Sequence, residues 1–129
     1  MVSGTSAISP RSQNPLPRAA RIAKRREFLD AYERGEKMFG RYSVLFVVEN
    51  TSGSRIGVTA TKKVGKANVR NRMKRWVREV FRHNRTWLPS LDFVVNLKTG
   101  APGATFREFS SDLEKLFRRT RTRGPVGGA

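Results

Sequence analysis

The stretch from Lys62 to Arg85 holds the side chains with the greatest chemical capacity in this sequence. It contains ten Lys or Arg and a single acidic residue, Glu79, whereas an ordinary solvated helix face mixes both signs in i,i+4 pairs. Phosphate groups would supply the missing anions, because Arg binds a phosphate through two hydrogen bonds and also stacks on bases. Gly65 predicts a tight turn before a helix whose N-terminal amides would add to a phosphate site.

The net charge of the whole chain indicates the same kind of partner. The 129 residues include 27 Lys or Arg and 10 Asp or Glu, which gives a formal charge of +17. Nucleic acid is therefore the first expectation, an anionic membrane surface the second and an acidic protein the third, with a merely solubilising basic surface as the alternative. No apolar run approaches the roughly 20 residues of a membrane-spanning helix. The lack of Cys excludes disulfides, thiol nucleophiles and Cys-based metal sites.

Three aromatic residues form a second candidate site. Phe28 and Tyr32 are spaced i,i+4 on an expected helix, and Phe46 lies on an expected strand. Core packing would explain them, and so would a surface on which unpaired RNA bases stack. Three cations nearby in the sequence would then contact phosphates: Arg25, Arg26 and Arg41.

The sequence offers no convincing catalytic constellation or metal site. The carboxylates are scattered, the strands carry only Glu49 and Asp92, and His83 has no obvious partner. Lys63-Val-Gly-Lys66 lacks the leading Gly and the following Ser or Thr of a phosphate loop that hydrolyses nucleotides. The residues therefore indicate a binding protein, with no catalytic and no metal-binding side chain assigned.

Hydrophobic periodicity predicts the elements that must position these residues. Apolar spacing at i, i+3 and i+4 predicts three helices, and apolar or alternating runs predict strands, the first two of which we expect to pair as a hairpin. Gly35 is expected to end the first helix, Gly35 to Gly40 has room for one more strand, and Thr105-x-x-Glu108 resembles a capping box. The expected helices are 24–33, 68–83 and one opening after Thr105, and the expected strands are 42–49, 55–61 and 91–97.

This pattern predicts an α+β sandwich in which one layer is a single sheet. Residues 21–119 form the expected domain, between a Pro- and Ser-rich basic tail at 1–20 and a polar tail at 120–129, both expected to be disordered. The acid-free N-terminus also resembles an organelle transit peptide, although no amphipathic stripe runs through it.

Three segments carry a resemblance to the bacterial ribonuclease P protein subunit. Arg55-Ile-Gly is followed by Thr61-Lys-Lys-Val-Gly-Lys-Ala and by Arg70-Asn-Arg-Met-Lys-Arg-Trp-Val-Arg-Glu, as in that family's signature. Phe28, Tyr32 and Gly35 are similar to its upstream pattern. Asn68 departs from the family's aliphatic residue and is expected to act as an N-cap.

The resemblance implies a fold and an activity. The fold would be a two-layer α+β sandwich in α-β-β-β-α-β-α order, with three helices and a mixed sheet of about four strands. It would include a left-handed strand–helix–strand crossover, an exception to a strong rule, and would be similar to the second domain of ribosomal protein S5. The chain would join one catalytic RNA as a monomeric, cytoplasmic subunit and promote removal of the 5′ leader from precursor tRNA. The RNA subunit and substrate would bind the required Mg²⁺.

The resemblance also implies residue roles. The precursor leader would contact Phe28, Tyr32, Arg41 and Phe46. The RNA subunit would contact nine residues: Lys62, Lys63, Lys66, Arg70, Asn71, Arg72, Lys74, Arg75 and Arg78. A generic ribosomal or RNA-chaperone protein is the alternative, and a protein nuclease and a membrane binder are weaker ones.

Overall fold

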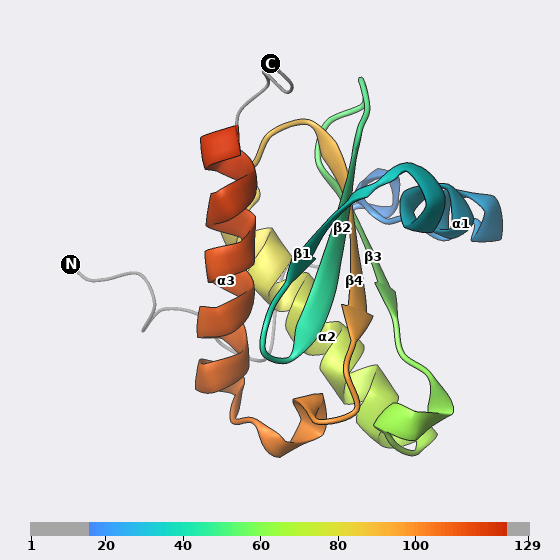
Figure 1. The fold of residues 1–129 in the computed structure, drawn as a ribbon, viewed down its shortest axis with the longest axis vertical. Helices are drawn as coiled ribbons and strands as arrows, with labels where there is room; N and C mark the ends of the chain where they lie inside the picture. Colours follow the sequence, from blue (N-terminus) through green and yellow to red (C-terminus); the bar gives the residue numbers. More distant parts are fainter. Residues whose placement is uncertain (1–15, 124–129) are drawn as a thin grey trace.

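The computed structural model describes residues 16–123, which form three helices and a four-stranded sheet (Figure 1). The strand order is β1-β2-β4-β3, with β3 parallel to β4 and the other neighbours antiparallel. The expected element order is therefore confirmed. The helices are α1 (Arg25–Arg34), α2 (Ala67–Asn84) and α3 (Phe106–Arg123), and the strands are β1 (Glu36–Phe39), β2 (Ser43–Glu49), β3 (Arg55–Thr59) and β4 (Leu91–Leu97).

The two faces of the sheet are covered unequally. Helices α2 and α3 lie along one face, and α1 projects to the side over part of the other (Figure 1). The larger core lies under α2 and α3, where Leu45, Phe93 and Phe117 are fully buried. A smaller cluster under α1 contains Phe46 and Val94. The remainder of the α1-side face is left without a helix over it.

The predicted hairpin between the second and third strands is wrong. β4 lies between β2 and β3, pairing Leu45 with Val95 on one side and Val58 with the same Val95 on the other. Periodicity identifies strands but carries no information on which strands pair, and a turn-rich loop was consistent with either arrangement. The chain passes from β3 through α2, behind the sheet in Figure 1, to β4 in the left-handed sense that the resemblance implied.

The helix ends follow the expected chemistry in two places out of three. The Thr105 amide donates to Glu108 Oε1 at 2.9 Å, and the Glu108 amide donates to Thr105 Oγ1 at 3.1 Å, which completes the predicted capping box. Gly35 ends α1, and its amide donates to the Ala31 carbonyl. Asn68 is not an N-cap, because α2 begins at Ala67 with Lys66 in the capping position.

The folded part extends beyond both predicted boundaries. Leu16 and Ala20 are buried in the main core, so residues 16–20 belong to the domain. Ile22 follows, and its amide donates to the Ile56 carbonyl at 2.9 Å along the outer edge of β3. At the other end, α3 continues to Arg123, and its buried side includes Phe117 and Thr120. The rest of each predicted tail lies outside the described residues.

None of the helices between residues 16 and 123 is long and apolar enough to cross a membrane.

The capping box gives a prediction for stability. Thr105→Ala removes the hydroxyl that accepts from the Glu108 amide, so it should lower the free energy of unfolding by about 1 kcal/mol in urea denaturation. Thr86→Ala is the matched control, because Thr86 is exposed in the turn after α2, and it should change stability by less than about 0.5 kcal/mol. Equal effects of the two variants would contradict the capping role.

Candidate nucleic-acid interface

A basic surface covers the start of α2 and the short 3₁₀ turn Lys62–Val64 before it. Most of its side chains are exposed, and Arg70, Lys74 and Arg78 are half-buried. In the described part of the chain none of its cations forms an ion pair with a carboxylate. Because these cations are accessible to solvent and have no carboxylate partner, they are available to bind phosphate. The basic surface comprises all nine residues predicted for the RNA subunit: Lys62, Lys63, Lys66, Arg70, Asn71, Arg72, Lys74, Arg75 and Arg78.

Gly65 sets the geometry of this surface. Its φ of +156° lies in the region that favours glycine, and a Cβ there would meet Val69 at 2.9 Å. The Gly65 carbonyl accepts a hydrogen bond from Arg70 Nε at 3.1 Å, which links the turn to the helix. On the next turn, the Arg72 guanidinium lies 5.4 Å from the Trp76 ring centroid, a cation–π contact. Local contacts therefore hold Arg70 and Arg72 in place before any ligand arrives.

One cation beside the basic surface was not predicted from the sequence. Burial and, secondarily, the positive charge of Arg21 lower the pKa of Arg78. Arg21 comes close because it pairs with Ile56 beside β3. Two neighbouring guanidiniums without a carboxylate repel each other, and a phosphate between them would relieve that repulsion. Only the strand pairing, which no local pattern encodes, brings Arg21 here.

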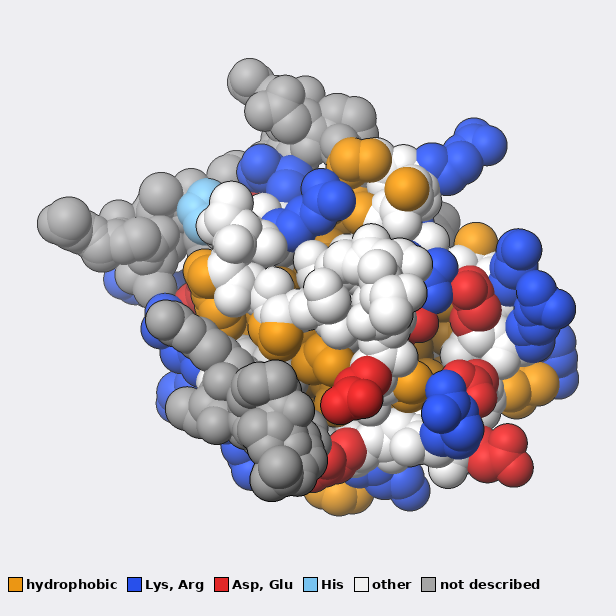
Figure 2. Space-filling model, turned by 90° about the horizontal axis from the view of Figure 1, so that it is seen from above, with side chains coloured by type: hydrophobic (Ala, Val, Ile, Leu, Met, Phe, Trp, Pro, Cys, Tyr) orange, Lys and Arg blue, Asp and Glu red, His pale blue; other side chains and the backbone are white. Residues whose placement is uncertain are grey.

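Acidic residues outside the basic surface form hydrogen bonds and ion pairs that stabilise the fold. On the α1 side, Arg55 donates to Asp92 at 2.7 and 2.8 Å and to Glu27 at 3.0 Å. The hydrogen bonds to Asp92 and to Glu27 raise the pKa of Arg55, whereas its burial acts in the opposite direction. Buried Glu79 pairs with Arg82 at 2.6 Å. Figure 2, seen from above, shows acidic side chains set among basic ones at this end of the molecule.

The three predicted aromatic residues lie together on the α1 side of the sheet. Tyr32 packs edge-on to Phe46 with ring centroids 4.9 Å apart, and its hydroxyl hydrogen-bonds to Thr59 Oγ1 at 2.8 Å. Phe28 and Tyr32 are half-exposed, whereas Phe46 is only 7% exposed. Lys37 on β1 lies 5.8 Å from the Phe46 centroid, so it supplies a cation that the sequence did not single out. We call Phe28, Tyr32 and Phe46 the aromatic surface.

Gly57 determines how closely Phe28 approaches the sheet. A Cβ at Gly57 would lie 2.8 Å from the Phe28 ring and 3.0 Å from Ile22 Cβ. The absence of a side chain there lets the Phe28 ring lie directly on the strand. Gly57 is thus a positioning residue for the aromatic surface. The sequence showed Gly57 as part of the Arg55-Ile-Gly motif, but no role was predicted for it.

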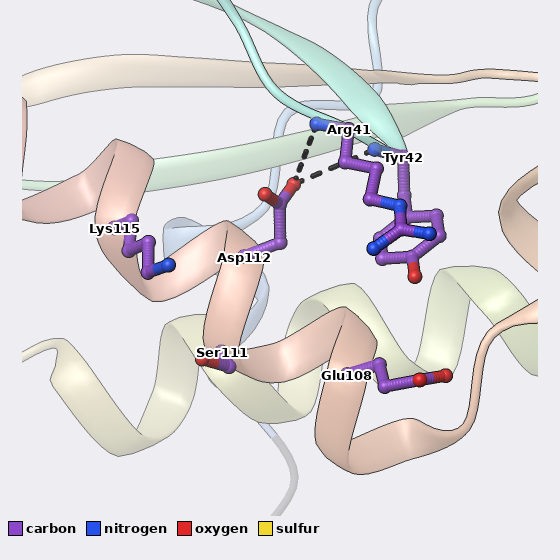
Figure 3. Close-up of a pocket in the computed structure, with 6 residues that line it drawn as sticks. All are labelled: Arg41, Tyr42, Glu108, Ser111, Asp112 and Lys115. Carbon is purple, nitrogen blue, oxygen red and sulfur yellow. Dashed lines mark hydrogen bonds between the residues drawn. The ribbon is translucent and has the colours of Figure 1, made fainter.

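Arg41, predicted to join the aromatic surface, lies on the other side of the molecule. Its guanidinium lies 5.3 Å from the centroid of the Tyr42 ring, which belongs to the core under α3. In Figure 3, Arg41 lines a pocket of about 270 Å³ with residues of α3, where Asp112 accepts hydrogen bonds from the Arg41 and Tyr42 amides. Arg41 follows the β1–β2 turn toward the helices, so closeness in sequence to Phe46 did not mean closeness in space.

The side chains from residue 16 to 120 do not provide a metal centre. No group of three or more His, Asp or Glu there is placed to hold an ion. Asp30, Glu27 and Asp92 come nearest, around one pocket beside Arg26, but each is hydrogen-bonded to an arginine. The donor set therefore does not fit a Mg²⁺ resident in these residues.

A small α+β domain with cations free of carboxylate partners on one helix, and with half-exposed aromatic rings beside its sheet, has the features of the nucleic-acid-binding class of proteins. The family model described as Ribonuclease P matches residues 16–121. The chain belongs to the ribonuclease P protein family. Its function is that of the family, RNA binding in tRNA processing as the protein subunit of ribonuclease P.

Individual relatives agree in sequence and in fold. A ribonuclease P protein component of Citrifermentans bemidjiense is 37% identical over 107 residues, which cover 82% of this chain and 92% of the relative. The RNase P protein structure from Staphylococcus aureus superimposes with a TM-score of 0.73 at 27% identity, covering 78% of this chain and 94% of that one. The Thermotoga maritima RNase P protein gives 0.71 at 33%, covering 77% and 96%.

The close approach at Gly57 is testable by a double-mutant cycle. Gly57→Ala should lower the free energy of unfolding by about 1–3 kcal/mol, because the added methyl overlaps the Phe28 ring. In a Phe28→Ala background the same substitution should cost clearly less. Gly103→Ala is the control, since a Cβ there meets nothing within 4 Å. Equal costs in both backgrounds, measured by urea denaturation, would rule out the contact with Phe28.

Proposed function

We propose that the basic surface binds the catalytic RNA subunit and that the aromatic surface binds the 5′ leader of precursor tRNA. The observation that carries this proposal is the continuity of the two surfaces along the chain. Thr59, bonded to Tyr32 on the aromatic surface, ends β3, and the basic surface begins three residues later at Lys62. An RNA subunit bound to α2 would therefore lie next to a single-stranded leader that crosses the face of the β-sheet.

The aromatic rings divide the work of leader binding by their exposure. Phe28 and Tyr32 are half-exposed and offer ring surface to unpaired bases, whose stacking on aromatic side chains tolerates any sequence. Phe46 is buried beneath Tyr32, and the edge-on contact between the two rings fixes the position of the Tyr32 ring. Lys37 would neutralise a phosphate at this position, whereas Arg41 lines a pocket beside α3.

We propose that hydrolysis takes place on the RNA subunit with Mg²⁺ held by RNA and substrate. The carboxylates of the described residues are bonded to arginines or scattered, and this supports a binding role for the protein. A protein of charge +17 lowers the repulsion between two RNAs and lowers the Mg²⁺ concentration they need. One protein with one RNA, in the cytoplasm, is the proposed assembly.

Reconstitution tests this function. The purified protein is mixed at low Mg²⁺ with a bacterial ribonuclease P RNA and 5′-labelled precursor tRNA, with each component alone as control. Cleavage at the mature 5′ end only in the complete mixture is expected. Cleavage by the protein alone would place an active site in the chain, and no stimulation by folded protein would indicate a generic RNA-binding or RNA-chaperone protein.

Arg75 tests the role of the basic surface. Arg75→Ala should weaken assembly with the RNA subunit and reduce the log–log salt slope of binding by about one unit, because one phosphate contact is lost. Arg34→Ala removes the same charge from α1, where Arg34 is paired with Asp30, and should leave the slope nearly unchanged. Filter binding over a salt series measures both, and an unchanged slope for Arg75→Ala would remove this residue from the interface.

Phe28 tests the aromatic surface. Phe28→Leu keeps an apolar group over Gly57 but removes the flat ring, so affinity for precursor tRNA should fall about tenfold while affinity for mature tRNA is unchanged. Tyr32→Phe keeps its ring and should retain the preference for precursor. Binding is measured with the assembled holoenzyme, and thermal melting checks the fold. Equal losses for precursor and mature tRNA would contradict leader binding.

A further inference from the structure

The most exposed large apolar side chain in the described part of the chain is that of Phe39, with 65% of its surface accessible. It is the last residue of the edge strand β1. Single exposed apolar residues are common on proteins, so exposure alone assigns no role. The position of Phe39 on the sheet is what makes it informative.

Phe39 points to the same face as the aromatic surface. In the β1–β2 register Lys37 pairs with Phe46 and Phe39 pairs with Val44, and residues paired across strands share a face. The intervening Met38 is buried in the core on the opposite face. Phe39 therefore lies two residues beyond Lys37, about 7 Å along the strand, in the direction away from α1. Half-buried Val44 fills the space beside it, so the open sheet face continues apolar.

The backbone under Phe39 is held rigidly. The Gly40 amide donates to the Ser43 carbonyl at 2.8 Å, and Lys98 Nζ donates to the Gly40 carbonyl at 2.7 Å. Asp112 accepts from the Arg41 amide at 2.9 Å and fixes the same turn to α3. An exposed ring on a fixed strand loses little conformational freedom when a flat partner stacks on it.

We propose that Phe39 is a further base-stacking residue, which binds a leader nucleotide upstream of those on the aromatic surface. This inference rests on the proposed path of the leader. The occupant is single-stranded RNA because the chain carries charge +17 and because a cation, Lys37, lies over the Phe46 ring two residues from Phe39 on the same face of the sheet. An apolar ring beside a cation at this spacing gives one stack and one phosphate contact for each nucleotide of an extended strand. Phe39 thereby sets how long a leader the protein recognises.

The test uses reconstituted holoenzyme and precursor tRNAs whose leaders are lengthened one nucleotide at a time. Phe39→Ala should leave short-leader substrates unaffected and weaken binding by about tenfold once the leader reaches the additional position. Replacing the base at that position by an abasic site should abolish the difference between Phe39→Ala and the unsubstituted protein. Phe39→Trp keeps a flat aromatic ring, so this variant should retain the tighter binding of leaders that reach the additional position.

Leu29→Ala is the matched control, because Leu29 is 49% exposed on α1 and lies outside both surfaces. Equal loss at every leader length, or no loss at any, would overturn the role of Phe39. If Phe28→Leu shows leader dependence and Phe39→Ala does not, only this inference fails. If neither does, the proposed leader path itself fails. A change in sedimentation caused by Phe39→Ala would instead assign the ring to contact between copies of the chain.

Discussion

The aromatic surface and the open face of the sheet beside it depend on the hydrogen-bonded group formed by Arg55, Asp92 and Glu27. These three residues come from β3, β4 and α1, so one guanidinium joins the helix to two strands. Each is only partly exposed, and removal of one partner would leave a desolvated charge without compensation. With α1 fixed at this end, Phe28 lies on Gly57 and the Tyr32 hydroxyl reaches Thr59. The half of the sheet beyond α1 consequently remains open.

The fold separates the two signs of charge. Acidic side chains such as Glu79, Asp92 and Asp112 form intramolecular ion pairs and hydrogen bonds that stabilise the fold. The basic surface keeps its charges without carboxylate partners, and this costs stability through mutual repulsion. Asp112 also fixes the β1–β2 turn from the side of α3, so that a bond on one face of the sheet steadies the side chains presented on the other. The protein is thereby arranged to gain stability from the RNA that it binds.

The elements and the basic surface were predictable because their signals are local. The apolar stripe from Val69 to Phe81 specified α2, the Thr105 capping box specified the start of α3, and the density of cations indicated the basic surface. Strand pairing was not predictable, because β2 and β3 are joined by a turn-rich loop yet each pairs with β4. A further non-local pairing, that of Arg21 with Ile56, brings Arg21 to Arg78, and the direction of the turn carries Arg41 away from Phe46. Residue roles suggested by family motifs still required spatial placement.

The N-terminal segment that lies along the outer edge of β3 has a consequence for solubility. An edge strand presents unpaired amides and carbonyls on which another chain can add, and β3, with Ile56 and Val58, has a composition prone to such addition. The bond from the Ile22 amide to the Ile56 carbonyl, followed by the helix at Arg25, occupies that edge. The segment thus guards against edge-to-edge aggregation while it delivers the charge of Arg21, and a chain trimmed up to residue 22 would expose a template for intermolecular sheet growth.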